Sequence, residues 1–188
     1  VVAPFDSISC TLESFQFTTD NLDTTDTFQV STDVGDSNTL NAVHYTLEQV
    51  SDTRNGNSDD IYEMIVFDGE LYFGAADSSG NYKVFKTDGS TVTQVSNTNN
   101  GGSDVYTQPS FTEYDSELYF QGIDSSGKYK LFKTDGTTVT QVSDIWSGNH
   151  DYPGNFKVYN SELYFYGNNT SGKAKLHKTD GSTITQVS

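Results

Sequence analysis

ELYFQGIDSSGKYKLFKTDG, residues 117–136, contains the two blocks that recur most closely along this chain. The first block, Glu-Leu-Tyr-Phe, starts at Glu70, Glu117 and Glu162, and the second, Lys-Thr-Asp-Gly, starts at Lys86, Lys133 and Lys178. A third block, Gln-Val-Ser, follows at Gln94, Gln141 and Gln186. Three blocks that keep one order at intervals of 45 to 47 residues indicate a tandem repeat.

Each repeat divides into four short segments of β-forming residues separated by turn residues. In the clearest repeat, the segments 62–67 and 70–75 flank Asp68-Gly69, which is typical of a two-residue hairpin turn because glycine tolerates a positive φ. Segments 81–86 and 91–96 flank a second turn of the same type. Four short antiparallel strands in about 45 residues are the pattern of a β-propeller blade.

The repeats therefore predict an all-β, β-propeller-like fold of about four tandem four-stranded blades over residues 27–188. The expected units are approximately 27–51, 52–96, 97–143 and 144–188. The first unit is a degraded copy that lacks Lys-Thr-Asp-Gly, as terminal repeats often do because they cap an end. Four units could close into a small propeller, and an open stack or half of a larger ring completed by another chain are the alternatives.

LFKTDGT, residues 131–137, resembles the ELWxxDGT-type repeat of bacterial surface and secreted proteins. The resemblance spans about three quarters of the chain, and it implies propeller blades and an extracellular or cell-surface location. Phe85, Phe132 and His177 stand where that repeat has tryptophan, and its leading glutamate is missing. What the resemblance implies therefore concerns fold and compartment more than activity.

The net charge of −16, with only 10 Lys and Arg residues, argues against nucleic acid or an anionic membrane surface as a partner. No apolar run approaches the 18 residues of a membrane-spanning helix, so we expect no membrane insertion. The start at Val1, without an initiator Met or a charged segment, predicts a secreted protein whose signal peptide has been removed.

The longer loops of the repeats are polar and acidic, and they are expected on one face of the blades. Oxygen ligands of this kind suit Ca²⁺, and the predicted site comprises Asp59, Asp60, Asp104 and Asp151. The alternative is an ordinary set of solvated loops. The aspartates of the tight Asp-Gly turns are expected to be turn formers.

Three further residues of the loop entering the last blade are candidates for binding sugar: Trp146, His150 and Tyr152. Aromatic rings beside polar groups can stack on sugar rings, and the alternative for Trp146 is packing. Asn168 and Asn169 each begin an N-glycosylation pattern in a predicted surface loop, so glycosylation is expected at one of them.

Residues 1–26 lie outside the repeats and are predicted to form an extended N-terminal arm. Its apolar side chains are the expected assembly residues: Val1, Val2, Phe5, Phe15 and Phe17. The arm completes a blade within the molecule or, alternatively, pairs with an open sheet edge of a neighbour and builds a filament.

The leading functional prediction is a secreted, non-enzymatic structural or adhesive protein that self-associates, with an extracellular fibre subunit as its specific form. No catalytic residues are predicted, because no nucleophile motif is present and no Cys/His pair has the spacing of a zinc site. A carbohydrate-binding module that uses the long-loop face is the first alternative. A hydrolase with paired carboxylates is the second.

Overall fold

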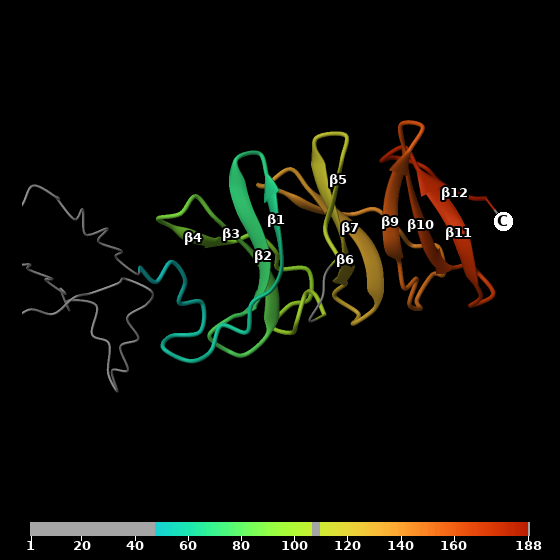
Figure 1. The fold of residues 1–188 in the computed structure, drawn as a ribbon. Helices are drawn as coiled ribbons and strands as arrows, with labels where there is room; N and C mark the ends of the chain where they lie inside the picture. Colours follow the sequence, from blue (N-terminus) through green and yellow to red (C-terminus); the bar gives the residue numbers. More distant parts are fainter. Residues whose placement is uncertain (1–47, 107–109, 188) are drawn as a thin grey trace, which may run out of the picture. The chain divides into compact units, whose positions relative to one another are not determined.

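The computed structural model describes residues 48–106 and 110–187, and every regular element in these ranges is a β-strand (Figure 1). Twelve strands form three four-stranded antiparallel sheets, which confirms the predicted architecture for three repeats. The predicted N-terminal arm and most of the degraded first unit lie outside the described residues. In the described part, no helix is long and apolar enough to cross a membrane.

The three sheets have matching strands. The first contains β1 (Tyr62–Phe67), β2 (Glu70–Ala76), β3 (Tyr82–Thr87) and β4 (Val92–Gln94). The second contains β5 (Thr112–Tyr114), β6 (Glu117–Ile123), β7 (Tyr129–Thr134) and β8 (Val139–Gln141). The third contains β9 (Gly154–Tyr159), β10 (Glu162–Asn168), β11 (Ala174–Thr179) and β12 (Ile184–Gln186). In each sheet the strands pair in sequence order, as in a propeller blade.

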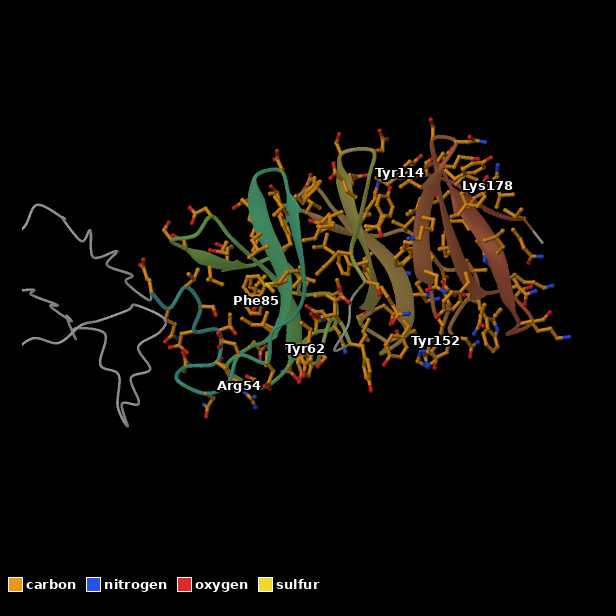
Figure 2. The ribbon with its side chains drawn as sticks, in the orientation of Figure 1. Arg54, Tyr62, Phe85, Tyr114, Tyr152 and Lys178 are labelled. Atoms are coloured by element: carbon orange, nitrogen blue, oxygen red, sulfur yellow. The ribbon has the colours of Figure 1, made fainter. Side chains whose placement is uncertain are left out.

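Tight turns join the first two strands of each sheet and lie at the same end of the three sheets (Figure 1). Asp68 and Gly69 have φ values of 49° and 78°, and a pair of positive φ values is what the two-residue hairpin turn requires. Ser116 and Ser161 adopt φ values of 59° and 58° in the equivalent turns. Tyr114 lies toward this end of the sheets and Tyr152 toward the opposite end (Figure 2).

The recurring Glu and Lys of the sequence blocks pair across the second and third strands of every sheet. Lys86 Nζ lies 2.7 Å from Glu70, and the equivalent pairs in the second and third sheets measure 2.7 and 2.9 Å. These groups are partly exposed, so each pair contributes at most about 1 kcal/mol. They fix strand register more than they determine stability.

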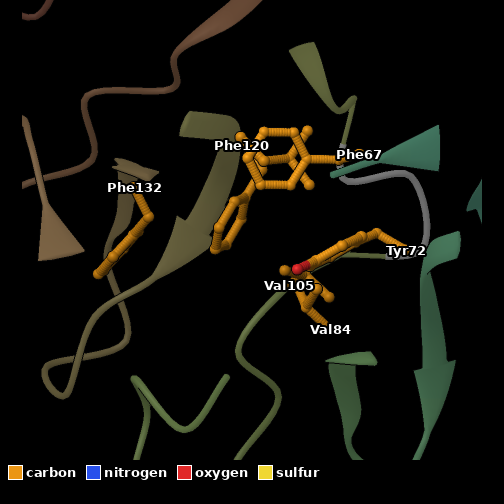
Figure 3. Close-up of a cluster of buried hydrophobic side chains, with 7 residues drawn as sticks. Phe67, Tyr72, Val84, Val105, Phe120 and Phe132 are labelled. Atoms are coloured by element: carbon orange, nitrogen blue, oxygen red, sulfur yellow. The ribbon is translucent and has the colours of Figure 1, made fainter. Parts of the chain in front are cut away.

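The first and second sheets meet through one hydrophobic cluster (Figure 3). Tyr72 and Val84 from the first sheet pack with Leu118, Phe120 and Phe132 from the second. All five side chains are buried. Since burying one large apolar side chain stabilises a protein by about 1.5–3 kcal/mol, this junction contributes substantially to the fold.

The repeated tyrosine and the repeated turn glycine belong to one contact between neighbouring sheets. A Cβ added at Gly136 would collide with the Tyr72 hydroxyl, and a Cβ at Gly181 would come within 2.9 Å of the Tyr119 hydroxyl. Each tyrosine therefore packs beneath the Asp-Gly turn of the next repeat. A Cβ added at Gly89, the equivalent glycine of the first sheet, would have no described atom within 4 Å.

Replacing Gly136 by alanine should destabilise the protein more than replacing Gly89 does. Both glycines have a positive φ, of 90° and 95°, so both substitutions carry the same backbone strain. Only the change at Gly136 adds a collision with Tyr72, and overpacking of this kind typically costs about 1–3 kcal/mol. Urea unfolding of the two variants measures the difference, and equal midpoints would show that this contact does not couple the sheets.

Candidate functional site

Asp104, one of the aspartates predicted to bind Ca²⁺, is fully buried where the first sheet meets the second. Its carboxylate accepts hydrogen bonds from Ser96 Oγ at 2.8 Å and from the Asn99 amide at 2.7 Å, and Lys83 Nζ lies 3.0 Å away. Its backbone carbonyl accepts a hydrogen bond from the Ile123 amide at 2.6 Å. Asp104 therefore connects the third and fourth strands of the first sheet with the second sheet.

Asp151 and Asp59 occupy the equivalent position in the neighbouring repeats. Asp151 accepts a hydrogen bond from Ser143 Oγ at 2.7 Å, and Lys130 Nζ lies 3.2 Å from its carboxylate. Asp59 accepts the matching hydrogen bond from Ser51 Oγ at 2.6 Å. No lysine of the described ranges pairs with Asp59.

The four predicted metal ligands are thus distributed over three loops rather than gathered into one set. Asp60, the fourth of them, forms an ion pair with Arg54 at 2.9 Å. Within residues 48–106 and 110–187, no group of three or more His, Cys, Asp or Glu side chains could hold a metal ion. The structure gives three of these aspartates a role in joining repeats that the sequence analysis missed, and Ca²⁺ binding stays a prediction.

Two of the three predicted sugar-binding residues lie together. The rings of His150 and Tyr152 stack with centroids 4.9 Å apart, and Tyr129 lies 5.2 Å from each of them. Trp146 is not part of this aromatic cluster. A Cβ added at Gly172 would collide with its indole, so Trp146 packs against the loop that follows β10.

The two predicted glycosylation asparagines have different surroundings. Asn168 Nδ2 donates a hydrogen bond to the His150 carbonyl at 3.2 Å. Asn169 Oδ1 accepts hydrogen bonds from the backbone of Ser171 and Lys173, which leaves its Nδ2 without a hydrogen bond to described residues. N-linked glycans attach to that nitrogen, so Asn169 is the better placed of the two.

A cavity of about 420 Å³ lies between the second and third sheets, and its lining includes His177, which departs from the repeat. Small-molecule sites in proteins typically measure about 300–1,000 Å³. Apolar side chains come from Val142, Ile145 and Ile184. The polar lining includes Asp144 and His177.

His177 replaces the phenylalanine found at this position in the first two sheets, and its ring stacks on Phe165 with centroids 5.6 Å apart. Its Nδ1 lies 3.1 Å from the Lys175 carbonyl. Because a carbonyl can only accept, Nδ1 carries the proton and Nε2 is left as an acceptor. Nε2 is buried and has no hydrogen-bond partner among the described residues.

The equivalent position in the first junction shows what this histidine changes. Phe132 belongs there to the hydrophobic cluster between the first and second sheets, packed with Val139 and Val95. In the third sheet His177 at this position lines a cavity instead. The sequence contained the signal, since Phe85, Phe132 and His177 align in the repeat, and only the first two are apolar.

Two titratable groups, His177 and Asp144, determine the charge of the cavity lining. Burial lowers the pKa of His177 below its ordinary value, and the Lys175 carbonyl and Asp151 only partly oppose this effect. The Lys130 ammonium donates a hydrogen bond to Asp144 at 2.6 Å, which holds the pKa of that carboxyl below its usual range. At neutral pH the cavity therefore contains a neutral imidazole and a carboxylate that is already paired.

A second cavity, of about 380 Å³, lies where the first strands of the three sheets approach one another. Glu63 and Lys157 are the charged residues of its described lining. A glycosidase that uses two carboxylates needs both of them on opposite sides of one sugar bond. The described lining of this cavity supplies one.

The sequence has no significant match to a protein-family model or to a curated protein. The fold is similar to the solved structure of an α-L-arabinofuranosidase from Clostridium thermocellum, with 16% sequence identity and a TM-score of 0.41. The similarity covers 69% of this chain and 53% of the arabinofuranosidase chain, or about half the length of that protein.

The prediction that this protein is not an enzyme is corrected by this comparison. The solved structure to which the chain is similar is that of an enzyme, so the non-enzymatic part of the leading prediction is withdrawn. Sugar binding and hydrolysis, the two alternatives from the sequence, are considered below.

Folding stability should depend on pH through His177. Its pKa is lowered in the folded protein, so the unfolded chain binds the proton more readily. The contribution of His177 to the free energy of unfolding is then constant above about pH 7. It falls as the pH drops through about 6.5, the ordinary pKa of histidine. His177→Phe, which restores the residue of the other repeats, should lack this component.

Urea midpoints of the wild type and His177→Phe at pH 7.5, 6.5 and 5.5 measure this effect. The carboxylates and the other two histidines are common to both proteins, so the difference between their pH profiles isolates His177. Parallel profiles would mean that His177 is not held neutral by its surroundings.

Proposed function

We propose that this protein binds a neutral carbohydrate in the cavity between its second and third sheets. The observation that carries the proposal is His177, which lines a cavity of about 420 Å³ and whose buried Nε2 has no hydrogen-bond partner among the described residues. Leaving a buried acceptor unpaired costs about 1–3 kcal/mol. A ligand hydroxyl that donates to Nε2 would remove this cost, and because Nε2 is closed to solvent this contact requires the imidazole to turn toward the cavity.

The other polar groups of the cavity favour hydroxyl donors and acceptors over charged ligands. Asp144 is negatively charged and can accept further hydrogen bonds. Asn169 and Gln186 contribute side-chain amides to the lining. The carboxylate and the net charge of −16 disfavour anionic ligands, while Lys130 already neutralises Asp144 and weakens its attraction for cations.

The apolar part of the lining also suits a sugar. Val142, Ile145 and Ile184 contribute side chains that can contact the C–H face of a pyranose or furanose ring. A sugar presents this apolar face together with hydroxyls at its edge. The mixture of three aliphatic side chains with His177 and Asp144 matches both features.

Extracellular location and fibre formation, which were predicted from the sequence, remain proposals beside this one. Carbohydrate binding is compatible with both, because surface and secreted proteins meet glycans outside the cell. Hydrolysis of the bound sugar is the second candidate function, and the binding experiment includes a test for it.

Binding can be tested by applying the full chain to a glycan array and then titrating glucose, galactose, mannose and N-acetylglucosamine calorimetrically. We expect binding to at least one sugar, with affinity reduced at least tenfold by His177→Phe because Nε2 is lost. A tenfold change corresponds to about 1.4 kcal/mol. A matched control is His150→Ser, since serine occupies that position in the earlier repeats at Ser58 and Ser103.

The control should retain binding because His150 does not line the cavity. An empty glycan array, or equal affinities of the wild type and His177→Phe, would refute the proposal. Release of reducing ends from each oligosaccharide that binds on the array would show that binding is followed by hydrolysis.

A further inference from the structure

The outer face of the third sheet carries side chains that are buried at the two junctions within the protein. Leu176 is 41% exposed, whereas its equivalent in the second sheet, Leu131, is 0% exposed. Tyr164 is half-buried, whereas Tyr119 is fully buried beneath the turn glycine of the next repeat. We refer to Tyr164, Lys175 and Leu176 as the tail surface.

The first sheet has an exposed face that corresponds to the face by which the second and third sheets pack on the sheet before them. Met64 is 67% exposed, whereas Phe156, its equivalent in the third sheet, is 6% exposed. A Cβ added at Gly89 would have no described atom within 4 Å, whereas the equivalent glycines contact a tyrosine of the preceding sheet. We refer to Asp59, Met64 and Gly89 as the head surface.

The tail surface contains a lysine, Lys175, and the head surface an aspartate, Asp59, at the positions that form an ion pair at each junction within the chain. Lys83 pairs with Asp104 and Lys130 pairs with Asp151, each across a junction between sheets. Lys175 is the next lysine in this series, and none of the described residues forms an ion pair with it. Asp59, at the other end, is the aspartate without a described lysine.

Residues 1–47 cannot provide the lysine that Asp59 lacks. All ten Lys and Arg residues of the chain lie between Arg54 and Lys178, so the preceding segment contains none. The degraded first unit therefore cannot reproduce the ion pair of the two existing junctions. A second copy of the chain can, because it carries Lys175 on its tail surface.

We propose that copies of this protein associate head to tail, with the tail surface of one copy packed on the head surface of the next. Lys175 pairs with Asp59 of the next copy, Leu176 covers Met64, and Tyr164 packs beneath the turn at Gly89. The contact repeats the ion pair and the turn contact of the two junctions already present within each chain. Such an interface joins two different surfaces, so it produces a closed ring or a filament.

Phe73 and Phe85, on the same side of the first sheet, are stacked and already buried. The contact between copies therefore adds burial at Met64 and at the turn rather than at these rings. It also differs from assembly through the N-terminal arm, because it uses residues of the repeats alone.

The oligomeric state of the full chain over a wide range of concentrations tests this proposal. Sedimentation velocity should show association of the wild type, and Lys175→Glu should weaken it at least tenfold by placing two carboxylates together. The control is Lys173→Glu, which makes the same charge change on an exposed lysine outside the tail surface. Circular dichroism checks that the variants remain folded.

Charge reversal on the head surface provides the second variant. Asp59→Lys alone should also prevent association, and combining it with Lys175→Glu should restore association by exchanging the two charges. Three results would overturn the proposal: a wild type that remains monomeric, association unaffected by Lys175→Glu, or association lost only on deletion of residues 1–17. The last result would assign assembly to the arm.

Discussion

A lysine buried against an aspartate determines how one sheet follows the next in this protein. Lys83 with Asp104 and Lys130 with Asp151 lie at the two junctions, and all four side chains are almost completely buried. Burying such charges is costly unless each is paired and hydrogen-bonded, and each aspartate also accepts hydrogen bonds from a serine hydroxyl and from backbone amides. Lys130 Nζ donates a hydrogen bond to Asp151, whereas Lys83 Nζ lies 3.0 Å from Asp104 without a hydrogen bond to a described residue. The strands of each sheet form from local sequence, but their stacking depends on this pair.

Local pattern predicted the strands and turns well because both arise from short-range physics. Alternating β-forming residues and Asp-Gly pairs place the strand boundaries near 62, 67 and 70 without any knowledge of neighbouring sheets. The junction residues were harder to recognise. Asp104 lies in a polar loop and resembles a solvated or metal-binding carboxylate, since its partner Lys83 is distant in sequence and becomes its neighbour only on folding.

The candidate site shows the same division between local and long-range information. The sequence singled out the loop with Trp146, His150 and Tyr152, and the structure stacks two of these rings, while the start of the same loop, Asp144 and Ile145, lines the cavity. His177 was visible as a departure from the repeat, yet only the packing of two sheets shows that it lines a cavity and that its Nε2 is buried without a partner among the described residues. The third repeat thus combines the shared junction chemistry with a histidine that lines the cavity.

A double-mutant cycle between Lys83 and Asp104 tests the central role of the buried pair most directly. Lys83→Met and Asp104→Asn should each cost about 3–5 kcal/mol in unfolding free energy, because each leaves one buried charge uncompensated. The double variant should be more stable than the sum of the two losses by about 1–3 kcal/mol. The same cycle on the partly exposed pair Lys86 and Glu70 should give a coupling of no more than about 1 kcal/mol. A Lys83–Asp104 coupling within about 0.5 kcal/mol of zero would contradict the account.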